Sequence, residues 1–420
     1  MGTIHVSGAK NSALPCMAAA ILTEDEVTLE NMPHVRDIET EKRLLASMGA
    51  EIGPGDAPNT TTISCRKLSD PVARYEIVKT MRASSLVLGP LIARAGVARV
   101  AMPGGCAIGG RPIDLHIRGL EKMGVTIAQE HGYLEARVEQ LRGAHLLFDR
   151  TTVTGTEDLL MAAVLAEGES LMENCACEPE VTDLSALLVA MGANIEGAGT
   201  STIRVRGVNQ LHGARYRINP DRIEAGTFLV AGAITGGDLT VANCNPEHLS
   251  AVITKLREAG VSVDVLGPDS LHVRAEKQLY ATDISTKEYP GFPTDMQAQY
   301  MALATQAEGV SVIEENIFEN RFMHVQELVR MGANIKVEGR TATVRGPAKL
   351  SAAAVMCSDL RASASLVLAA LVADGESILD RVYHMDRGYE RIEEKLAGVG
   401  AQIRRMGNIF PPKGEPTNAA

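Results

Sequence analysis

The sequence contains no tryptophan and few aromatic residues of any kind. Among 420 residues only 3% are Phe or Tyr, while 45% are hydrophobic. We therefore expect an aliphatic core, and we do not expect stacking on aromatic rings to dominate ligand binding. No apolar run is long enough for a membrane span, and the net charge of −11 argues against a nucleic-acid-binding protein. Neither a membrane nor a nucleic acid is expected as a partner.

The cysteines lack the spacing of metal or disulfide sites. They form no CxxC pair and no Cys/His ligand set, so neither a zinc centre nor a disulfide framework is predicted. An odd number of thiols scattered through apolar segments fits a reducing cytoplasm. Buried, unreactive thiols are expected at Cys16, Cys65, Cys244 and Cys357. The other three cysteines are Cys106, Cys175 and Cys177.

A short pattern recurs six times along the chain. It consists of an apolar residue, Gly, Ala or Val, any residue, and Ile or Val, and its glycines are Gly49, Gly124, Gly192, Gly260, Gly332 and Gly400. The steps between these glycines are 75, 68, 68, 72 and 68 residues, which indicates a repeat architecture. Each glycine is predicted to end an amphipathic helix and to precede a strand. The predicted helices cover residues 38–47, 114–122, 182–190, 248–258, 324–330 and 388–397.

The other half of each repeat is predicted to be an apolar helix followed by a strand. These helices begin near Ser12, Ser85, Asp158, Gly226, Asp295 and Ala362, and their composition is typical of helices buried on most sides. Three repeats per lobe give an α/β fold of two lobes with helices inside and sheets outside. Residues 12–220 are assigned to the first lobe, and 1–11 with 221–409 to the second. The strand at 3–7 is expected to pair in the second lobe, and residues 410–420 to be a disordered tail.

A glycine-rich loop, Pro103–Pro112, contains Cys106 and Arg111. Its four glycines allow a ligand to approach the backbone closely. Beside a guanidinium group, the thiol of Cys106 is a candidate nucleophile or general acid. A surface turn with an incidental cysteine is the other interpretation of this loop.

Eight motifs taken together resemble the UDP-N-acetylglucosamine enolpyruvyl transferases. The resemblance extends from Gly8 to Arg405 and implies an inside-out α/β barrel of two lobes that close around substrate. It implies transfer of the enolpyruvyl group of phosphoenolpyruvate to the 3-hydroxyl of UDP-N-acetylglucosamine in peptidoglycan synthesis, without a metal or other cofactor. The motifs are the Cys106 loop, 7–15, 79–84, 221–226, 292–297, 319–324, 359–363 and 386–391.

The resemblance also implies roles for single residues. Cys106 matches the proton donor and the target of the covalent inhibitor fosfomycin, and Asp295 matches the group that accepts the proton of the sugar hydroxyl. Phosphoenolpyruvate carries two anionic groups, for which arginine forks are well suited. By matching motifs, Lys10, Arg111 and Arg387 are assigned to its phosphate, and Arg321 and Arg361 to its carboxylate or to lobe closure.

Further residues match contacts to the nucleotide sugar. They are Asn11, Arg82, Arg111, Pro112, Ile113, Asp114, Leu115, Arg150, Thr151, Thr152, Val153 and Ile317. Helix N-capping is an alternative role for both Asp295 and Asp114, since each opens a predicted helix. His116 is interpreted as a packing residue or an indirect donor.

Two alternatives to this function were considered. The sister enzyme that uses shikimate 3-phosphate shares the fold, but its site lacks the Cys106 loop. A non-catalytic paralogue that binds nucleotide sugars is the other alternative, and Lys10, Cys106, Asp295 and Arg387 argue against it. The chain departs from the usual pattern at Cys177, where relatives often have Arg, and at Thr154, where many have Gly.

Overall fold

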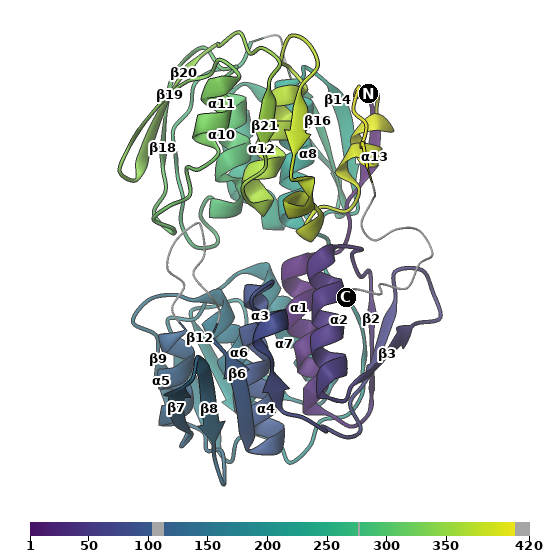
Figure 1. Cartoon of the computed structure of the whole chain (residues 1–420), viewed down its shortest axis with the longest axis vertical. Helices are drawn as coiled ribbons and strands as arrows, with labels where there is room; N and C mark the ends of the chain where they lie inside the picture. Colours follow the sequence, from purple (N-terminus) through teal and green to yellow (C-terminus); the bar gives the residue numbers. More distant parts are fainter. Residues whose placement is uncertain (103–112, 276–277, 408–420) are drawn as a thin grey trace. The chain divides into compact units, whose positions relative to one another are not determined.

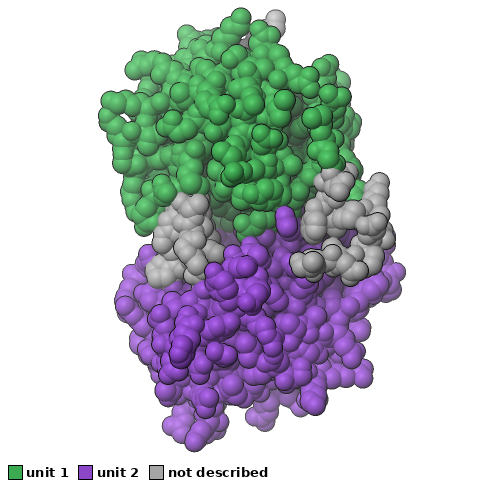
Figure 2. Space-filling view, viewed as in Figure 1, with its two compact units in different colours: residues 1–7, 106–110, 220–420 green, residues 8–105, 111–219 purple. Residues whose placement is uncertain are grey.

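The structure is a computed structural model that describes residues 1–102, 113–275 and 278–407, apart from the side chain of Arg82. The chain divides into two compact units (Figure 2). We call residues 8–102 and 113–219 the first lobe, which is purple in Figure 2. Residues 1–7, 220–275 and 278–407 form the second lobe, which is green. Residues 8–11, which the sequence analysis assigned to the second lobe, belong to the first because Lys10 and Asn11 begin its first helix.

The first lobe contains three sheets of four strands among its described residues. Its helices are α1 (Lys10–Ala19), α2 (Arg36–Met48), α3 (Tyr75–Val78), α4 (Leu88–Ala95), α5 (Asp114–Lys122), α6 (Val153–Ala163) and α7 (Pro179–Ala190), with 3-10 turns η1 (Ala20–Leu22) and η2 (Arg82–Val87). Its strands are β2 (Glu26–Glu30), β3 (Glu51–Pro54), β4 (Thr61–Ser64), β5 (Val72–Ala73), β6 (Val97–Ala101), β7 (Thr126–Glu130), β8 (Tyr133–Arg137), β9 (His145–Leu147), β10 (Glu169–Glu173), β11 (Asn194–Glu196), β12 (Thr202–Arg206) and β13 (Arg215–Arg217).

The second lobe repeats this plan with one incomplete sheet. Its helices are α8 (Arg222–Ile234), α9 (Ser250–Glu258), α10 (Gln297–Ala304), α11 (Val325–Arg330), α12 (Leu360–Ala370) and α13 (Ile392–Ala397), with 3-10 turns η3 (Pro246–Leu249), η4 (Thr294–Met296) and η5 (Val382–Arg387). Its strands are β1 (Gly2–His5), β14 (Asp238–Ala242), β15 (Val261–Gly267), β16 (Ser270–Ala275), β17 (Ile284–Ser285), β18 (Gly309–Glu314), β19 (Asn334–Glu338), β20 (Thr341–Gly346), β21 (Ala354–Met356) and β22 (Ile378–Asp380).

All five four-stranded sheets have the same topology. In each, a short edge strand pairs in parallel with the strand that follows the core helix, and an antiparallel hairpin completes the sheet. The first lobe is closed by β13, which pairs with β2 from the other end of that lobe. In the second lobe β1 pairs in parallel with β14, which confirms the prediction that the first strand belongs there.

The core of each lobe is built on its apolar helices. Helices α8, α10 and α12 lie together inside the second lobe, with β14 and β18 on either side of them (Figure 1). All eight residues of α10 are buried, as are nine of the ten in α1. A helix without a polar face has to be covered on all sides, so the inside position predicted from composition is confirmed.

The six repeat glycines adopt left-handed backbone conformations. Their φ angles lie between 86° and 110°, and each stands within three residues after the last residue of a helix. This region is strained for residues with a Cβ atom, which explains why glycine recurs at these positions. The predicted helix ends are therefore confirmed.

The last repeat differs from the prediction. Its sheet consists of β21 and β22 alone, and no strand follows Gly400 in the described residues up to 407. Helix α13 starts at Ile392, four residues later than predicted, because Arg391 before it has a left-handed backbone, with a φ of 47°.

No helix in the described part of the chain has the length and apolar character needed to cross a membrane. The four cysteines predicted to be buried are buried, and burial raises the pKa of each of their thiols. They are therefore poor nucleophiles near neutral pH.

Candidate active site

Asp295 is held between two buried arginines in the second lobe. Its Oδ1 accepts a hydrogen bond from Nη2 of Arg321 at 2.7 Å, and its Oδ2 accepts one from Nε of Arg361 at 3.1 Å. The two arginines are 6% and 3% exposed, whereas a quarter of the Asp295 side chain remains exposed. Two adjacent guanidinium groups favour the ionised carboxylate.

The sequence analysis left open whether Asp295 and Asp114 are helix N-caps, and for both residues that alternative is wrong. Asp295 lies inside η4, whose N-cap residue is Pro293. The following helix, α10, has Met296 as its N-cap residue. Neither N-terminus is capped by a side-chain hydrogen bond. Asp114 is the first residue of α5, after the N-cap residue Ile113. The carboxylate of Asp295 is directed to the arginines instead.

The ring of Tyr389 packs against the guanidinium group of Arg361. The guanidinium carbon lies 5.3 Å from the centroid of the Tyr389 ring, and the buried hydroxyl of Tyr389 contacts Oγ1 of Thr227 at 2.9 Å and Nε2 of Gln299 at 3.1 Å. Gln299 also donates to the backbone carbonyl of Asp295. Burial by itself would lower the pKa of Arg361, but Tyr389 and Asp295 raise it above the ordinary value. The guanidinium group therefore stays charged.

Glu315 directly follows β18, and its carboxylate fixes the loop that leads from this strand toward Arg321. Its buried carboxylate accepts hydrogen bonds from Oγ1 of Thr286 and Thr294 and from the backbone N–H groups of Ile317 and Phe318, at 2.8 to 3.1 Å. The sequence analysis assigned Ile317 a ligand contact and did not identify Glu315. Its position after an apolar strand is the only local signal, and many surface glutamates share it.

His324 lies buried near Arg321 and Asp359. Neither ring nitrogen has a hydrogen-bond partner among the described residues, and burial lowers the pKa of His324 to about 4, with Asp359 opposing this shift and Arg321 adding to it. The imidazole is therefore neutral near pH 7 and adds no charge next to Arg321. Asp359 caps α12 by accepting from the backbone N–H groups of Arg361 and Ala362.

Arg387 is the last residue of η5, which packs against α12 in the second lobe. Arg321, Arg361, Asp295 and Arg387 thus all lie in one lobe, and the first three are in direct contact.

Lys10 is the corresponding cation of the first lobe. It is the first residue of α1 and is 8% exposed, and its Nζ lies 3.2 Å from Oδ2 of the buried Asp37 on α2. Glu41, one turn further along α2, is also buried, and burial, together with the charge of Asp37, raises its pKa to about 8. Asn11 follows Lys10 on α1 and is partly exposed. The sequence analysis identified neither Asp37 nor Glu41.

Seven of the predicted nucleotide-sugar residues of the first lobe lie at the N-terminal ends of two helices. Ile113, Asp114 and Leu115 begin α5, whereas Arg150, Thr151, Thr152 and Val153 lead into α6. Helix N-termini present unpaired N–H groups, which suit an anionic ligand.

His116 and Thr152 have structural roles in this region. Thr152 caps α6 by accepting from the backbone N–H of Gly155 at 3.2 Å. Nδ1 of His116 contacts the buried Asp158 at 2.9 Å, and its Nε2 contacts Thr154 at 3.3 Å. The packing role predicted for His116 is confirmed, and Thr154, a departure from the family pattern, makes one of its two contacts.

Cys106, Arg111 and Pro112 lie outside the described residues, and only the backbone of Arg82, at the start of η2, is described. The roles assigned to these residues therefore stay predictions.

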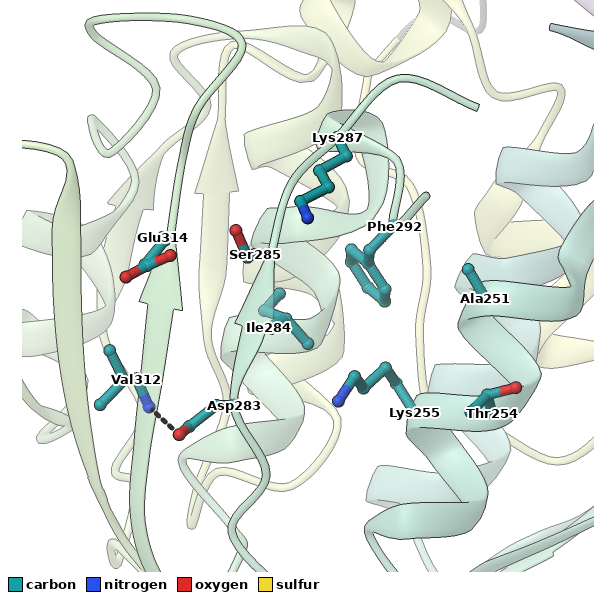
Figure 3. A pocket seen from close by; sticks show the side chains of 10 residues that line it. All are labelled: Ala251, Thr254, Lys255, Asp283, Ile284, Ser285, Lys287, Phe292, Val312 and Glu314. Carbon is teal, nitrogen blue, oxygen red and sulfur yellow. Dashed lines mark hydrogen bonds between the residues drawn. The ribbon is translucent and has the colours of Figure 1, made fainter. Parts of the chain in front are cut away.

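A cavity in the second lobe contains none of the predicted site residues. It measures about 530 Å³ and opens in the second lobe between α9 and the strands β17 and β18. In Figure 3, Lys255 and Lys287 extend toward it on either side of Phe292, and the backbone N–H of Val312 donates to Asp283 at 2.7 Å. The two lysines share this space with Asp283 and Glu314, so its lining carries no net charge.

The chain is similar to known proteins over nearly its whole length. Residues 1–396 match the model of the family described as EPSP synthase (3-phosphoshikimate 1-carboxyvinyltransferase). Two similar proteins are named UDP-N-acetylglucosamine 1-carboxyvinyltransferase. The one from Acidobacterium capsulatum is 76% identical over 417 residues, 99% of this chain and 96% of that protein. The one from Koribacter versatilis is 68% identical over 418 residues, again 99% and 96%.

Solved structures are similar over nearly the whole chain. The enolpyruvyl transferase NikO from Streptomyces tendae has a TM-score of 0.86 and 26% identity, with 96% of each chain covered. An EPSP synthase from Acinetobacter baumannii has a TM-score of 0.72 at 19% identity over 95% of this chain and 96% of that one, and this likeness shows the fold alone. By its sequence, its repeats and its fold, this chain belongs to the enolpyruvyl transferase family and is a transferase.

Proposed function

We propose that this chain transfers the enolpyruvyl group of phosphoenolpyruvate to the 3-hydroxyl of UDP-N-acetylglucosamine and releases phosphate. The observation that carries the proposal is the identity of 76% and 68%, over nearly full length, to proteins named for this activity. The reaction begins peptidoglycan synthesis. A cytoplasmic location is part of the proposal, and the free thiols of the described cysteines fit a reducing compartment.

The addition step needs an acid, a base and fixed cations. A proton is added to the methylene carbon of phosphoenolpyruvate, and the sugar oxygen bonds to the neighbouring carbon as it loses its own proton. We assign the acid to Cys106 and the base to Asp295, whose carboxylate is ionised between its two arginines. Elimination of phosphate and of one methyl proton from the tetrahedral intermediate then forms the enol ether product.

The cations of both lobes are assigned to the anionic substrate. Lys10, Arg111 and Arg387 are proposed for the phosphate, and Arg321 and Arg361 for the carboxylate. Charged hydrogen bonds from preorganised donors stabilise the charge that develops during the reaction. The buried network around Arg361 and Tyr389 supplies such preorganisation in the second lobe.

The residues at the starts of α5 and α6, together with Asn11, Arg82 and Ile317, are proposed to bind the nucleotide sugar. The exposed helix N-termini there suit the diphosphate. A ligand in this region is expected to protect the first turn of each helix from hydrogen exchange.

The substrate is tested by measuring phosphate release from phosphoenolpyruvate with two acceptors in parallel. We expect release with UDP-N-acetylglucosamine and none with shikimate 3-phosphate, the substrate after which the matching family model is named. Release with shikimate 3-phosphate alone would assign the chain to the sister activity. Release with neither acceptor would indicate a non-catalytic paralogue.

The role of Cys106 is tested with fosfomycin and mass spectrometry. We expect one adduct on the peptide containing Cys106 and loss of activity, because an activated thiolate opens the epoxide. Cys106→Ser should show neither the adduct nor appreciable turnover near neutral pH. Cys177→Ser is the matched control, since Cys177 is partly exposed and burial raises its pKa. An adduct that persists in Cys106→Ser would assign the reactive thiol elsewhere.

A further inference from the structure

Five of the six repeats include an antiparallel β-hairpin. The last repeat of the second lobe has none among its described residues. After α13 the chain from Ala401 to Gly407 forms no strand. Arg405, within this segment, is instead anchored to two acidic residues of the preceding turn and helix. This segment is therefore joined to the last repeat through charged groups of Arg405 and not as a strand of its sheet.

The contacts of Arg405 are bidentate on both sides. Its Nη1 and Nη2 donate to the two oxygens of Asp386 at 3.0 and 2.5 Å, and its Nε and Nη2 donate to the oxygens of Glu393 at 2.7 and 3.4 Å. All three side chains are no more than 10% exposed. A fork that binds two carboxylates in this way fixes orientation as well as distance. We call Arg405, Asp386 and Glu393 the Arg405 clamp.

The Arg405 clamp holds the backbone on one side of Arg387, and buried residues hold it on the other. Asp386 directly precedes Arg387 in η5. Gly388, which follows, lies so close to Leu360 of α12 that a Cβ atom there would approach its side chain to 2.6 Å. The next residue, Tyr389, is 2% exposed and hydrogen-bonded through its hydroxyl. Arg387 therefore stands on a short turn that is anchored at both ends.

We propose that Arg405 is a positioning residue for Arg387. By binding Asp386 and Glu393 it fixes η5, so that the Arg387 guanidinium is presented to the phosphate of phosphoenolpyruvate in one orientation. This inference rests on the proposed function, which assigns Arg387 to that phosphate. Without the clamp, the buried carboxylates of Asp386 and Glu393 would lose their partner, and Asp386, which directly precedes Arg387, would compete with the substrate for that cation.

The neighbouring Arg404 provides a matched control. It forms a salt bridge with Glu376, but both side chains of this pair are more than 70% exposed. Exposed pairs of this kind contribute little to stability or orientation. The two adjacent arginines therefore differ in burial and geometry while sharing charge and position in the sequence.

The test compares Arg405→Lys with Arg404→Lys in steady-state kinetics, varying each substrate separately. Lysine keeps the charge but loses the fork. We expect Arg405→Lys to lower kcat/KM for phosphoenolpyruvate by about 10- to 100-fold, as expected for a misplaced binding group, and to leave KM for UDP-N-acetylglucosamine within about twofold. Arg404→Lys should resemble the wild type. Unchanged kinetics for phosphoenolpyruvate in a folded Arg405→Lys, or an equal loss for both substrates, would overturn the proposal.

Two further measurements keep the test decisive. Asp386→Asn removes the charge of one carboxylate partner of Arg405. It should show the same selective loss of kcat/KM for phosphoenolpyruvate. If thermal unfolding shows that both variants have lost the fold, Arg405 has a global structural role and the proposal fails.

Hydrogen exchange of peptides that cover residues 382–390 separates this inference from the proposed function. Exchange there should be faster in Arg405→Lys than in Arg404→Lys, whichever substrate the enzyme uses. Absence of turnover in the wild type would reject the proposed function, whereas unchanged exchange would reject the clamp.

Discussion

The two lobes each contain a buried charged cluster at the candidate site residues, and the two clusters have opposite compositions. In the first lobe the ammonium group of Lys10 lies beside an excess of acids. It pairs with Asp37, Glu41 lies nearby on α2, and Glu157 is buried elsewhere in that lobe with its pKa raised by burial and by neighbouring carboxylates. In the second lobe a single carboxylate, Asp295, lies between two buried guanidinium groups.

This difference determines what each lobe does when one partner is lost. A buried carboxylate without a cation can take up a proton and become neutral, but a guanidinium group cannot lose its proton in the accessible pH range. The cluster around Lys10 can therefore adjust its charge with pH through Glu41, whereas the cluster of Arg321 and Arg361 depends on Asp295. Four predictions follow from this comparison, from the largest expected effect to the smallest.

Asp295→Asn should have the largest effect. It leaves Arg321 and Arg361 buried without a shared anion, which we expect to cost about 3–5 kcal/mol of stability, independent of pH between 6 and 9 by the argument above. Turnover should fall by at least about 100-fold because the proposed base is lost. Thermal unfolding and phosphate release measure the two effects. Asp283→Asn, an exposed carboxylate of the same lobe, is the control, and a loss of similar size there would remove the contrast.

Glu41→Gln should stabilise the protein at high pH. The raised pKa, about 8 against an ordinary value of 4.5, means that the folded state keeps a proton that the unfolded state releases between these values. Stability of the wild type should therefore fall as pH rises through this window and level off above pH 8. The variant lacks this loss. The difference between its free energy of unfolding and that of the wild type should therefore be about 2–5 kcal/mol larger at pH 8.5 than at pH 4.5. Glu39→Gln, on the same helix but partly exposed, should show no such gain in unfolding experiments.

Lys10→Met should destabilise less than Asp295→Asn, and in a pH-dependent way. The loss relative to the wild type should be about 1–3 kcal/mol at pH 8.5 and smaller at pH 5.5, because Glu41, whose pKa is raised to about 8, keeps its proton at the lower pH and adds no second charge to this cluster. Lys42→Met, whose partner Glu39 is partly exposed, provides the baseline. Equal losses at both pH values would contradict the idea that the cluster around Lys10 adjusts its charge.

Capping changes should have the smallest effects and should be similar in the two lobes. Thr152→Ala removes the cap of α6 and should cost about 1 kcal/mol in thermal unfolding. Asp359→Ala removes the two-bond cap of α12 and should cost about 1–2 kcal/mol, since a charged cap also interacts with the helix dipole. A much larger loss for Asp359→Ala would mean that its charge supports Arg321 and His324 as well.

Much of the fold could be predicted because its signals are local. Each of the six glycines occupies a backbone conformation that only glycine adopts readily, so its neighbours in sequence suffice to place a helix end. The exception is the last repeat, where Gly400 has the same conformation but no strand follows. A glycine defines where the helix stops, and pairing with a distant strand decides whether the next residues form a sheet.

Less of the candidate site could be predicted. The family motifs identified Asp295, Arg321 and Arg361 as individual residues, but nothing in the sequence indicated that one carboxylate joins both arginines. Glu315 and Tyr389 were not identified, because a glutamate after a strand or a tyrosine before a helix is common. Their importance depends on contacts with residues far away in the chain.

Neighbouring residues thus determined the repeat, the apolar core helices and the helix ends, and the count of repeats indicated that β1 belongs to the second lobe. The tertiary structure alone decided the pairs Lys10 with Asp37, Asp295 with Arg321 and Arg361, and Arg405 with Asp386. The physical reason is range. Backbone preferences and hydrophobic periodicity act over a few residues, whereas a buried ion pair forms only where folding brings two side chains together and removes water from both.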